Sequence, residues 1–210
     1  MKITVTKPNA KRIDFIFELG AGDAMLPFPA AYITGDKIFR LRDGIISLIA
    51  FLMVRDAISN TLVFDGIEVP AHQAAAFQRA FAGFELYIHP ITNAEKAILP
   101  ALPPLTQETV LSENEQIEAD LAVRIDNLGF SITSRAASAD TERQVLKSSV
   151  PLFCAMACRD PVATLHAIQA CLAFEIHGAT AIVNADKAFQ NAPIRRLLAD
   201  SGFSFVLEAV

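Results

Sequence analysis

The two halves of this chain repeat one order of sequence elements, and no other feature constrains the fold as strongly. In the first half a β-like run ends in Arg42-Asp43 and passes into an apolar stretch, and the run at 152–158 ends in Arg159-Asp160 in the same way. Each half continues with a second β-like run, a helix-like stretch and a Gly-Phe pair. The offset between halves is 117 residues at the Arg-Asp pairs (159 − 42) and 119 at the pairs that start at Gly83 and Gly202 (202 − 83). A shared order at a nearly constant offset predicts an internal duplication.

Each copy is predicted to be a β-β-β-α-β-α-β unit. Strands that alternate with helices favour an α/β or α+β sheet with helices packed on it. Two tandem, diverged copies are expected to pack about a pseudo-twofold axis, as two subunits of a dimer would. Three prolines in residues 100–104 block regular structure and mark the boundary. The predicted organisation is a first repeat at 1–97, a Pro-rich and then acidic linker at 98–119, and a second repeat at 120–210.

Local patterns predict the individual elements. Asp43 is expected to cap the helix that follows it, because a carboxylate can accept from the free N–H groups of a first turn. The Asp65-Gly66 pair, followed by Pro70, favours a strand-to-helix loop over a hairpin. Residues 152–158 are read as a strand, because the stretch is short and apolar. The remaining expectations are a hairpin of 3–6 with 13–19, a strand-turn-strand at 31–41, helices at 44–54, 70–82, 162–177 and 192–201, and strands at 61–64, 85–88, 121–125, 130–134, 180–183 and 204–207.

Charge and hydropathy exclude two classes of partner. The net charge of −5 falls entirely in residues 105–210, which hold 8 basic and 13 acidic side chains, whereas residues 1–104 hold ten of each. Nucleic-acid binding needs a basic footprint, and the sequence shows none. The longest apolar run, residues 45–54, is far shorter than the ~20 residues that span a bilayer. We therefore expect neither a nucleic-acid nor a membrane partner.

Cysteines and histidines do not form a recognisable catalytic or metal-binding motif. Three cysteines, an odd number confined to one half, argue against a disulfide framework and favour a reducing compartment, the cytoplasm. Zinc sites usually draw on closer cysteine pairs than this chain offers. Core packing of the thiols is therefore favoured over a metal site, whose imagined ligands would be Cys154, Cys158, His166, Cys171 and His177.

Arg42 and Arg159 are the candidate anion-binding residues. Each precedes a predicted helix at the end of a predicted strand, where α/β proteins often bind ligands and where a helix N-terminus favours anions. One interpretation makes them a paired anion clamp near the pseudo-axis. The other makes each arginine a surface charge beside an aspartate that caps a helix.

One string in the second half carries a family resemblance. Residues 191–203, which run from Asn191 to Phe203, resemble the final helix and strand opening of GNAT-type N-acetyltransferases. The stretches 130–135 and 156–159 are similar to acyltransferase-like parts of carrier-protein-loading synthases. The resemblance implies a GNAT-like fold and coenzyme A binding by Arg159 and Asn191. The string at 159–164 stands where those enzymes carry a glycine-rich pyrophosphate loop, and Leu198 stands where they often carry a tyrosine.

The sequence supports a non-catalytic, duplicated α/β module that binds a protein partner or forms a homo-oligomer, with no cofactor. The alternative is an acyl-CoA-binding, GNAT-like acyltransferase or a degenerate relative of one. A third hypothesis is an enzyme with one site between the repeats, where Arg42 and Arg159 would hold an anionic substrate. Whether the chain is an enzyme stays open at this level.

Overall fold

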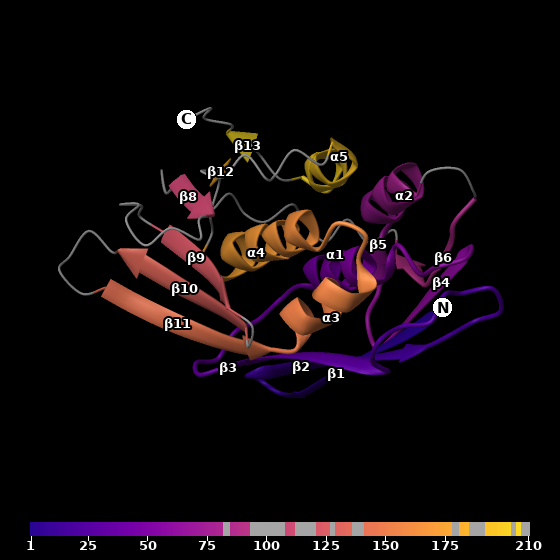
Figure 1. The fold of residues 1–210 in the computed structure, drawn as a ribbon, viewed down its shortest axis with the longest axis horizontal. Helices are drawn as coiled ribbons and strands as arrows, with labels where there is room; N and C mark the ends of the chain where they lie inside the picture. Colours follow the sequence, from indigo (N-terminus) through magenta and orange to yellow (C-terminus); the bar gives the residue numbers. More distant parts are fainter. Residues whose placement is uncertain are drawn as a thin grey trace.

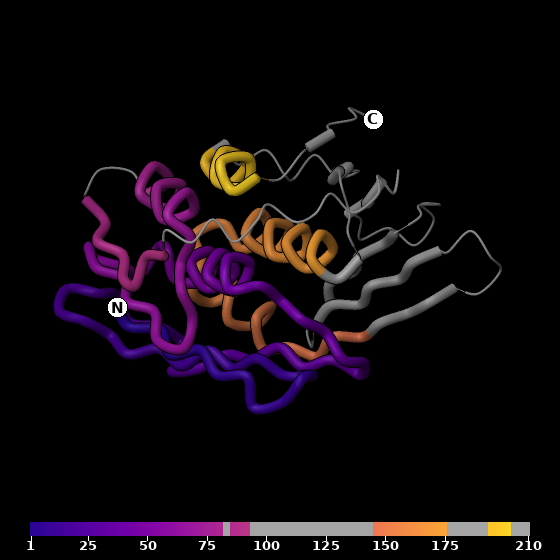
Figure 2. The backbone as a smooth tube through the Cα atoms, turned by 180° about the vertical axis from the view of Figure 1, so that it is seen from behind, coloured from indigo at the N-terminus to yellow at the C-terminus, as the bar shows by residue number. Residues whose placement is uncertain are grey.

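The computed structural model describes the backbone of residues 1–81, 85–92, 108–111, 121–126, 129–135, 141–177, 181–184, 192–202 and 205–206, and side chains within 1–81, 85–92, 145–175 and 193–202. Within these residues the fold is mixed α/β, with an 11-stranded sheet, a separate two-stranded sheet and five helices. The helices gather on one face of the sheet (Figure 1). The view from behind shows the same layering, with the central helices next to the N-terminal strands (Figure 2).

The chain opens with an antiparallel meander. It consists of β1 (Lys2–Asn9), β2 (Arg12–Glu18) and β3 (Ala30–Gly35). Buried and more accessible residues alternate along β2, in the first half of β1 and at the start of β3, so one face of the meander enters the core. The predicted hairpin at the N-terminus is confirmed, with Asn9 paired to Arg12 at its turn.

Two parallel strands and two helices extend this meander. The elements are α1 (Asp43–Val54), β4 (Thr61–Asp65), β5 (Val69–Pro70), α2 (Ala71–Ala80), β6 (Tyr87–His89) and β7 (Ile91–Thr92). β4 pairs in parallel with β1, and β6 pairs in parallel with β4. The chain leaves β4 through Gly66, whose φ is 87°, and the next strand, β5, pairs with β7 and leads into α2, so this connection is a strand-to-helix loop rather than a hairpin, as predicted.

The rest of the described chain adds a second antiparallel meander, formed by residues 121–126, 129–135 and 141–148, together with parallel strands and three helices. The elements are β8 (Glu108–Leu111), β9 (Leu121–Asp126), β10 (Gly129–Arg135), β11 (Thr141–Ser148), α3 (Val150–Ala157), α4 (Pro161–His177), β12 (Ala181–Asn184), α5 (Ala192–Asp200) and β13 (Phe205–Val206). The strand order in the large sheet is β13-β12-β8-β9-β10-β11-β3-β2-β1-β4-β6. β11 and β3 are antiparallel neighbours, so the two meanders meet edge to edge in the middle of the sheet.

The core lies between the sheet and the helices. Every residue from Ile45 to Val54 of α1 is buried. The ring of Phe51 stacks on that of Phe77 in α2, with centroids 4.3 Å apart. Phe17 of β2 contacts Phe153 of α3 at a centroid distance of 5.0 Å. The apolar cluster therefore continues from the first half of the chain into the second.

The strand prediction for residues 152–158 is wrong, because this stretch belongs to α3. Pro151 occupies the first turn of the helix, where its missing N–H is tolerated. Val150, Phe153 and Cys154 are buried while Leu152 and Met156 are exposed, which is a helical rather than an alternating pattern. The third strand of the second meander is β11 instead.

Smaller corrections concern element ends. Arg42, not Asp43, holds the N-cap position of α1, and the Asp43 carboxylate accepts a hydrogen bond from the ammonium of Lys7 at 2.9 Å. Residues 37–41 form no strand after the turn at the end of β3. Pro70 precedes α2 as its N-cap. The predicted linker 98–119 includes β8, which adds to the sheet between β9 and β12.

Candidate functional site at the ends of the central helix pair

Helices α1 and α4 form an antiparallel pair whose two ends are closed by similar contacts. At one end, the backbone N–H of Arg42 donates to Oε1 of Glu175, near the end of α4, at 2.8 Å. At the other, the backbone N–H of Arg159 donates to Oδ2 of Asp56, just beyond α1, at 2.9 Å. At each end, therefore, the backbone N–H of an arginine just before one helix donates to a carboxylate at the C-terminal end of the other helix.

The Arg42 end also contains a bidentate ion pair. Nε of Arg42 lies 2.9 and 3.0 Å from the two carboxylate oxygens of Glu175, and Nη2 lies 2.7 Å from Oε2. The Glu175 side chain is only 6% exposed, against 43% for Arg42. The guanidinium also lies 5.9 Å from the ring of Phe174. Glu175 thus neutralises the charge of Arg42, which the sequence analysis named as a candidate anion-binding residue.

At the Arg159 end, carboxylates surround the first turn of α4. Oδ1 of Asp160 accepts from the backbone N–H of Ala163 at 3.1 Å, as a helix cap does. The hydroxyl of Thr164 donates to the carbonyl oxygen of Asp160 at 2.8 Å. Together with Asp56 this places two negative charges where a helix N-terminus would otherwise attract an anion.

The structure does not bring the two predicted arginines together. Arg42 starts α1, whereas Arg159 contacts Asp56 past the other end of that helix. A helix of 12 residues is about 18 Å long, so the two arginines stand at opposite ends of the pair. The third predicted residue, Asn191, lies outside the described residues.

Sequence reasoning placed Cys154 and Cys158 on a strand, whereas the structure places this pair of thiols at the end of a helix, beside the Arg159 end. Cys154 and Cys158 lie one turn apart at the end of α3, and the N–H of Cys158 donates to the carbonyl oxygen of Cys154 at 3.0 Å. Cys154 is fully buried, while Cys158 is half-buried. Sγ of Cys158 lies 3.6 Å from the carbonyl oxygen of Met53 in α1. The signal in the sequence was the i, i+4 spacing, which has this meaning only on a helix.

The environment of the pair shifts the pKa values of its two thiols in opposite directions. The pKa of Cys158 is lowered, because Cys154 donates a hydrogen bond to it; the hydroxyl of Thr164 and the charge of Arg55 act in the same direction and outweigh burial. The same hydrogen bond, together with burial, raises the pKa of Cys154. Burial and the nearby Glu175 raise the pKa of Cys171. Among the three cysteines, the pKa is therefore lowered at Cys158 and raised at Cys154 and Cys171.

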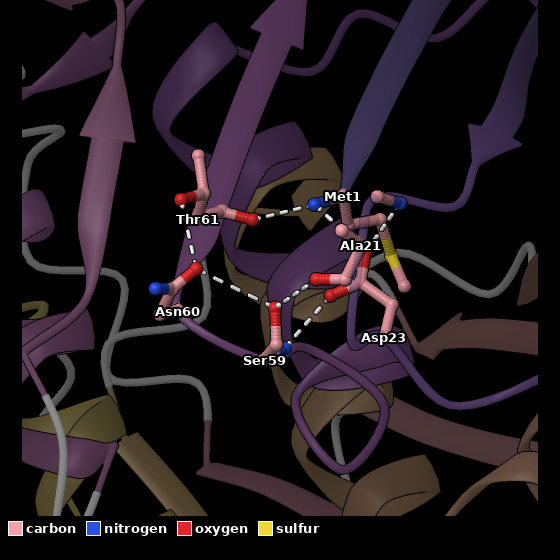
Figure 3. A network of polar contacts seen from close by, with 7 residues as sticks. Met1, Ala21, Asp23, Ser59, Asn60 and Thr61 are labelled. Atoms are coloured by element: carbon pink, nitrogen blue, oxygen red, sulfur yellow. Dashed lines mark hydrogen bonds and ion pairs between the residues drawn. The ribbon is translucent and has the colours of Figure 1, made fainter.

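A separate polar cluster, centred on Asp23, fixes the β2–β3 loop (Figure 3). Its carboxylate accepts from the backbone N–H groups of Gly20 and Ser59 at 2.7 and 2.8 Å, and it lies 2.9 Å from the ammonium of Met1. Burial alone would raise the pKa of Asp23, but these hydrogen bonds outweigh it and lower the pKa. The cluster ties three segments together and is structural.

Comparison with known proteins adds no family to this description. A scan against protein-family models, a search of curated proteins and a search of solved structures gave no match. Among the described residues, no group of three or more histidine, cysteine or acidic side chains could hold a metal ion. Likewise, no helix in the described part of the chain is long and apolar enough to cross a membrane.

Proposed function

We propose that the chain is an internally duplicated α/β protein whose halves pack about a pseudo-twofold axis. From the centre of the sheet outward, one side reads β3-β2-β1-β4-β6 and the other β11-β10-β9-β8-β12-β13. If α3 is left out, matching the elements in chain order pairs α1 with α4, and α2 with α5. The insertion of β8 and the presence of α3 are then departures of the second copy from the first.

Contacts between the halves support this axis. In the hydrogen bond from Arg42 to Glu175 the first half is the donor and the second half the acceptor. In the hydrogen bond from Arg159 to Asp56 donor and acceptor halves are exchanged, as they are in contacts across a twofold axis. The arginines of the two Arg-Asp pairs that first indicated the repeat are the donors in these contacts. Farther out, Arg79 of α2 forms an ion pair with Asp200 of α5 at 2.8 Å.

We further propose that the protein works by binding rather than by catalysis between its halves. A shared site would have to open along the α1–α4 pair. There α1 is buried on all sides from Ile45 to Val54, and the facing residues of α4, from Ala167 to Ala173, are also buried. The guanidinium of Arg42 is already paired with Glu175, and the backbone N–H of Arg159 donates to Asp56. This arrangement favours a scaffold over the hypothesis of an enzyme with a site at the repeat interface.

The observation that carries the binding proposal is the open face of the N-terminal sheet. This face consists of the side chains that alternate with the buried ones on β1, β2, β3, β4 and β6, and the helices lie on the other side (Figure 1). Ile16, Tyr32 and Tyr87 are 41%, 36% and 49% exposed on it. The register places Ile16 beside Thr4 and Ala30, in the middle of the meander. Exposed apolar side chains thus stand among polar ones on this face, a mixture that protein interfaces share.

The occupant that fits this face best is a second copy of the chain. The face carries both charge signs, and they are already paired: Lys2 lies 3.6 Å from Glu18 and 3.2 Å from Asp65, and Arg12 lies 2.8 Å from Asp14. Two copies of a chain with net charge −5 repel each other overall. A locally balanced face minimises that repulsion, whereas a basic or acidic partner would find no complementary field there.

The test of this proposal is the mass of the protein in solution. We expect light scattering after size exclusion to give about twice 22.7 kDa at micromolar concentration. Ile16→Asp should lower that mass to one chain, because it would bury an unpaired charge in the interface. Met25→Asp, at a position 84% exposed and outside the meander, is the matched control and should leave the dimer intact. A monomeric wild type, or an Ile16→Asp variant that still dimerises, would refute the proposal.

The coenzyme A alternative is tested by thermal stability. A ligand that binds only the native state raises the free energy of unfolding and therefore the melting temperature. At a ligand concentration one hundred times Kd, the gain in the free energy of unfolding is about 2.7 kcal/mol. With Asp56 and Asp160 at the start of α4, we expect millimolar acetyl-CoA to shift the melting temperature by less than about 1 °C. A larger shift that disappears in Arg159→Ala would favour the GNAT-like alternative instead.

A further inference from the structure

We propose that the first turn of α1, together with the side chain of Gln73 in α2, is a binding site for a phosphate group. The residues of this site belong to the first half of the chain and lie on the helix side of the sheet. The inference therefore depends neither on the dimer, which uses the other face of the sheet, nor on the duplication.

Helix α1 begins with backbone donors that no neighbouring group uses. Arg42 holds the N-cap position, and no side chain caps the helix. The N–H of Ile46 donates to the carbonyl oxygen of Arg42 at 3.0 Å, but within the described part of the chain no hydrogen bond reaches the N–H groups of Gly44 and Ile45. Free N–H groups in a first helical turn, with the helix dipole behind them, attract anions.

The buried amide of Gln73 distinguishes this helix end from an ordinary one. Gln73 is only 3% exposed, yet its side chain forms no hydrogen bond with any residue that the structure describes. Its Oε1 atom lies 2.8 Å from the point where a Cβ atom on Gly44 would stand, so the amide rests against the first turn of α1. An amide that is buried without a partner costs stability. A ligand bound at this turn would supply the missing hydrogen bond.

The charged side chains next to this turn leave its donors available. The Asp43 carboxylate accepts from the ammonium of Lys7 at 2.9 Å, and both side chains are about two-fifths exposed. Asp43 is therefore a neutralised surface charge and not a cap of α1. The start of α4 is different, because Asp160 caps that helix and Pro161 has no N–H to donate. This contrast places the site at α1 and not at α4.

The position of the turn and its donors favour phosphate among anions. The turn lies beside the carboxyl-terminal half of β1, through the contact of Lys7 with Asp43, and α/β proteins often bind ligands at this end of parallel strands. A second uncapped helix, α2, starts next to it, since Pro70 also packs against Gly44. Backbone donors of α1 and the amide on α2 reach the ligand from two elements. Phosphate has enough oxygens to contact all of them, whereas a carboxylate has two.

A titration of the ¹⁵N-labelled protein with inorganic phosphate at constant ionic strength tests this site. We expect saturable chemical-shift changes at the backbone amides of Gly44 and Ile45 and at the side-chain NH₂ of Gln73. Acetate should bind at least about tenfold more weakly, because it offers fewer acceptors. No saturable change at these groups, or acetate binding as tight as that of phosphate, would overturn the proposal. A parallel titration with glycerol phosphate shows whether free phosphate or a phosphate monoester is the better ligand, and saturation of the same groups by either supports the site.

Gln73→Leu separates ligand binding from a structural role. It removes the amide at similar volume and should weaken phosphate binding by about tenfold or more. In phosphate-free buffer its melting temperature should stay the same or rise, because the amide has no hydrogen bond to lose. Gln78→Leu is the matched control on the same helix: its Nε2 donates to the carbonyl oxygen of Leu86 at 3.1 Å, and its loss should leave phosphate affinity unchanged. A Gln73→Leu variant that melts earlier yet binds phosphate like the wild type would show that the residue is structural only.

Gly44→Ala tests the site from the side of α1. The added Cβ atom would stand 2.8 Å from Oε1 of Gln73 and displace the amide from the turn. Alanine suits a helix at least as well as glycine, so circular dichroism should show an intact fold. We expect the saturable response to phosphate to disappear. A folded Gly44→Ala variant that binds phosphate as tightly as the wild type would contradict the assignment.

Discussion

Replacing Gly66 with alanine is expected to lower the free energy of unfolding by about 3 kcal/mol or more. Gly66 has φ of 87°, where an L-residue with a Cβ atom is strained by about 1–2 kcal/mol. A Cβ atom there would also overlap the carbonyl oxygen of Val5 in β1. Because Thr4 pairs with Asp65 directly beside it, relief of the overlap requires β1 and β4 to separate.

Gly202 provides the matched control for this prediction. It has φ of 93°, at the end of α5, but a Cβ atom there would meet nothing within 4 Å. Gly202→Ala should therefore lose only the backbone contribution, about 1–2 kcal/mol. Urea unfolding followed by circular dichroism measures both variants. Equal losses at the two positions would mean that β1 is not packed against Gly66 as described.

Local patterns predicted the first half well because its elements are long or strongly patterned. The alternation in β1 and β2 and the apolar run of α1 each allow one interpretation. Residues 152–158 do not: a short apolar run fits a buried strand or a buried helix equally well. There Pro151 was the decisive residue, because it suits a first helical turn and would interrupt a strand.

The candidate site was less predictable, because its contacts join residues far apart in sequence. Arg42 and Glu175 are separated by 133 positions, and no local pattern connects them. Sequence order located both arginines before helices, but it could not show that the helices are antiparallel and hold the arginines apart. The strand prediction for residues 152–158 also placed Cys154 and Cys158 on the wrong kind of element.

The second large effect is expected from Phe51→Ala, which should lower the free energy of unfolding by about 3–5 kcal/mol. Phe51 is 1% exposed and stacks on Phe77 with rings 6° from parallel, so truncation leaves a cavity in the core. Met25→Ala, at an 84% exposed position, is the control and should cost less than about 0.5 kcal/mol.

This variant also decides whether the two predicted repeats, 1–97 and 120–210, unfold as one unit. The chain has no tryptophan, and both tyrosines, Tyr32 and Tyr87, report on the first half, whereas the buried Cys171 reports on the second. Since α1 packs against α4 and the apolar cluster spans both halves, Phe51→Ala should shift tyrosine fluorescence and Cys171 alkylation in urea to the same lower midpoint. If Cys171 kept its wild-type midpoint, the halves would be independent domains, and the contacts at the ends of the helix pair would merely dock one on the other.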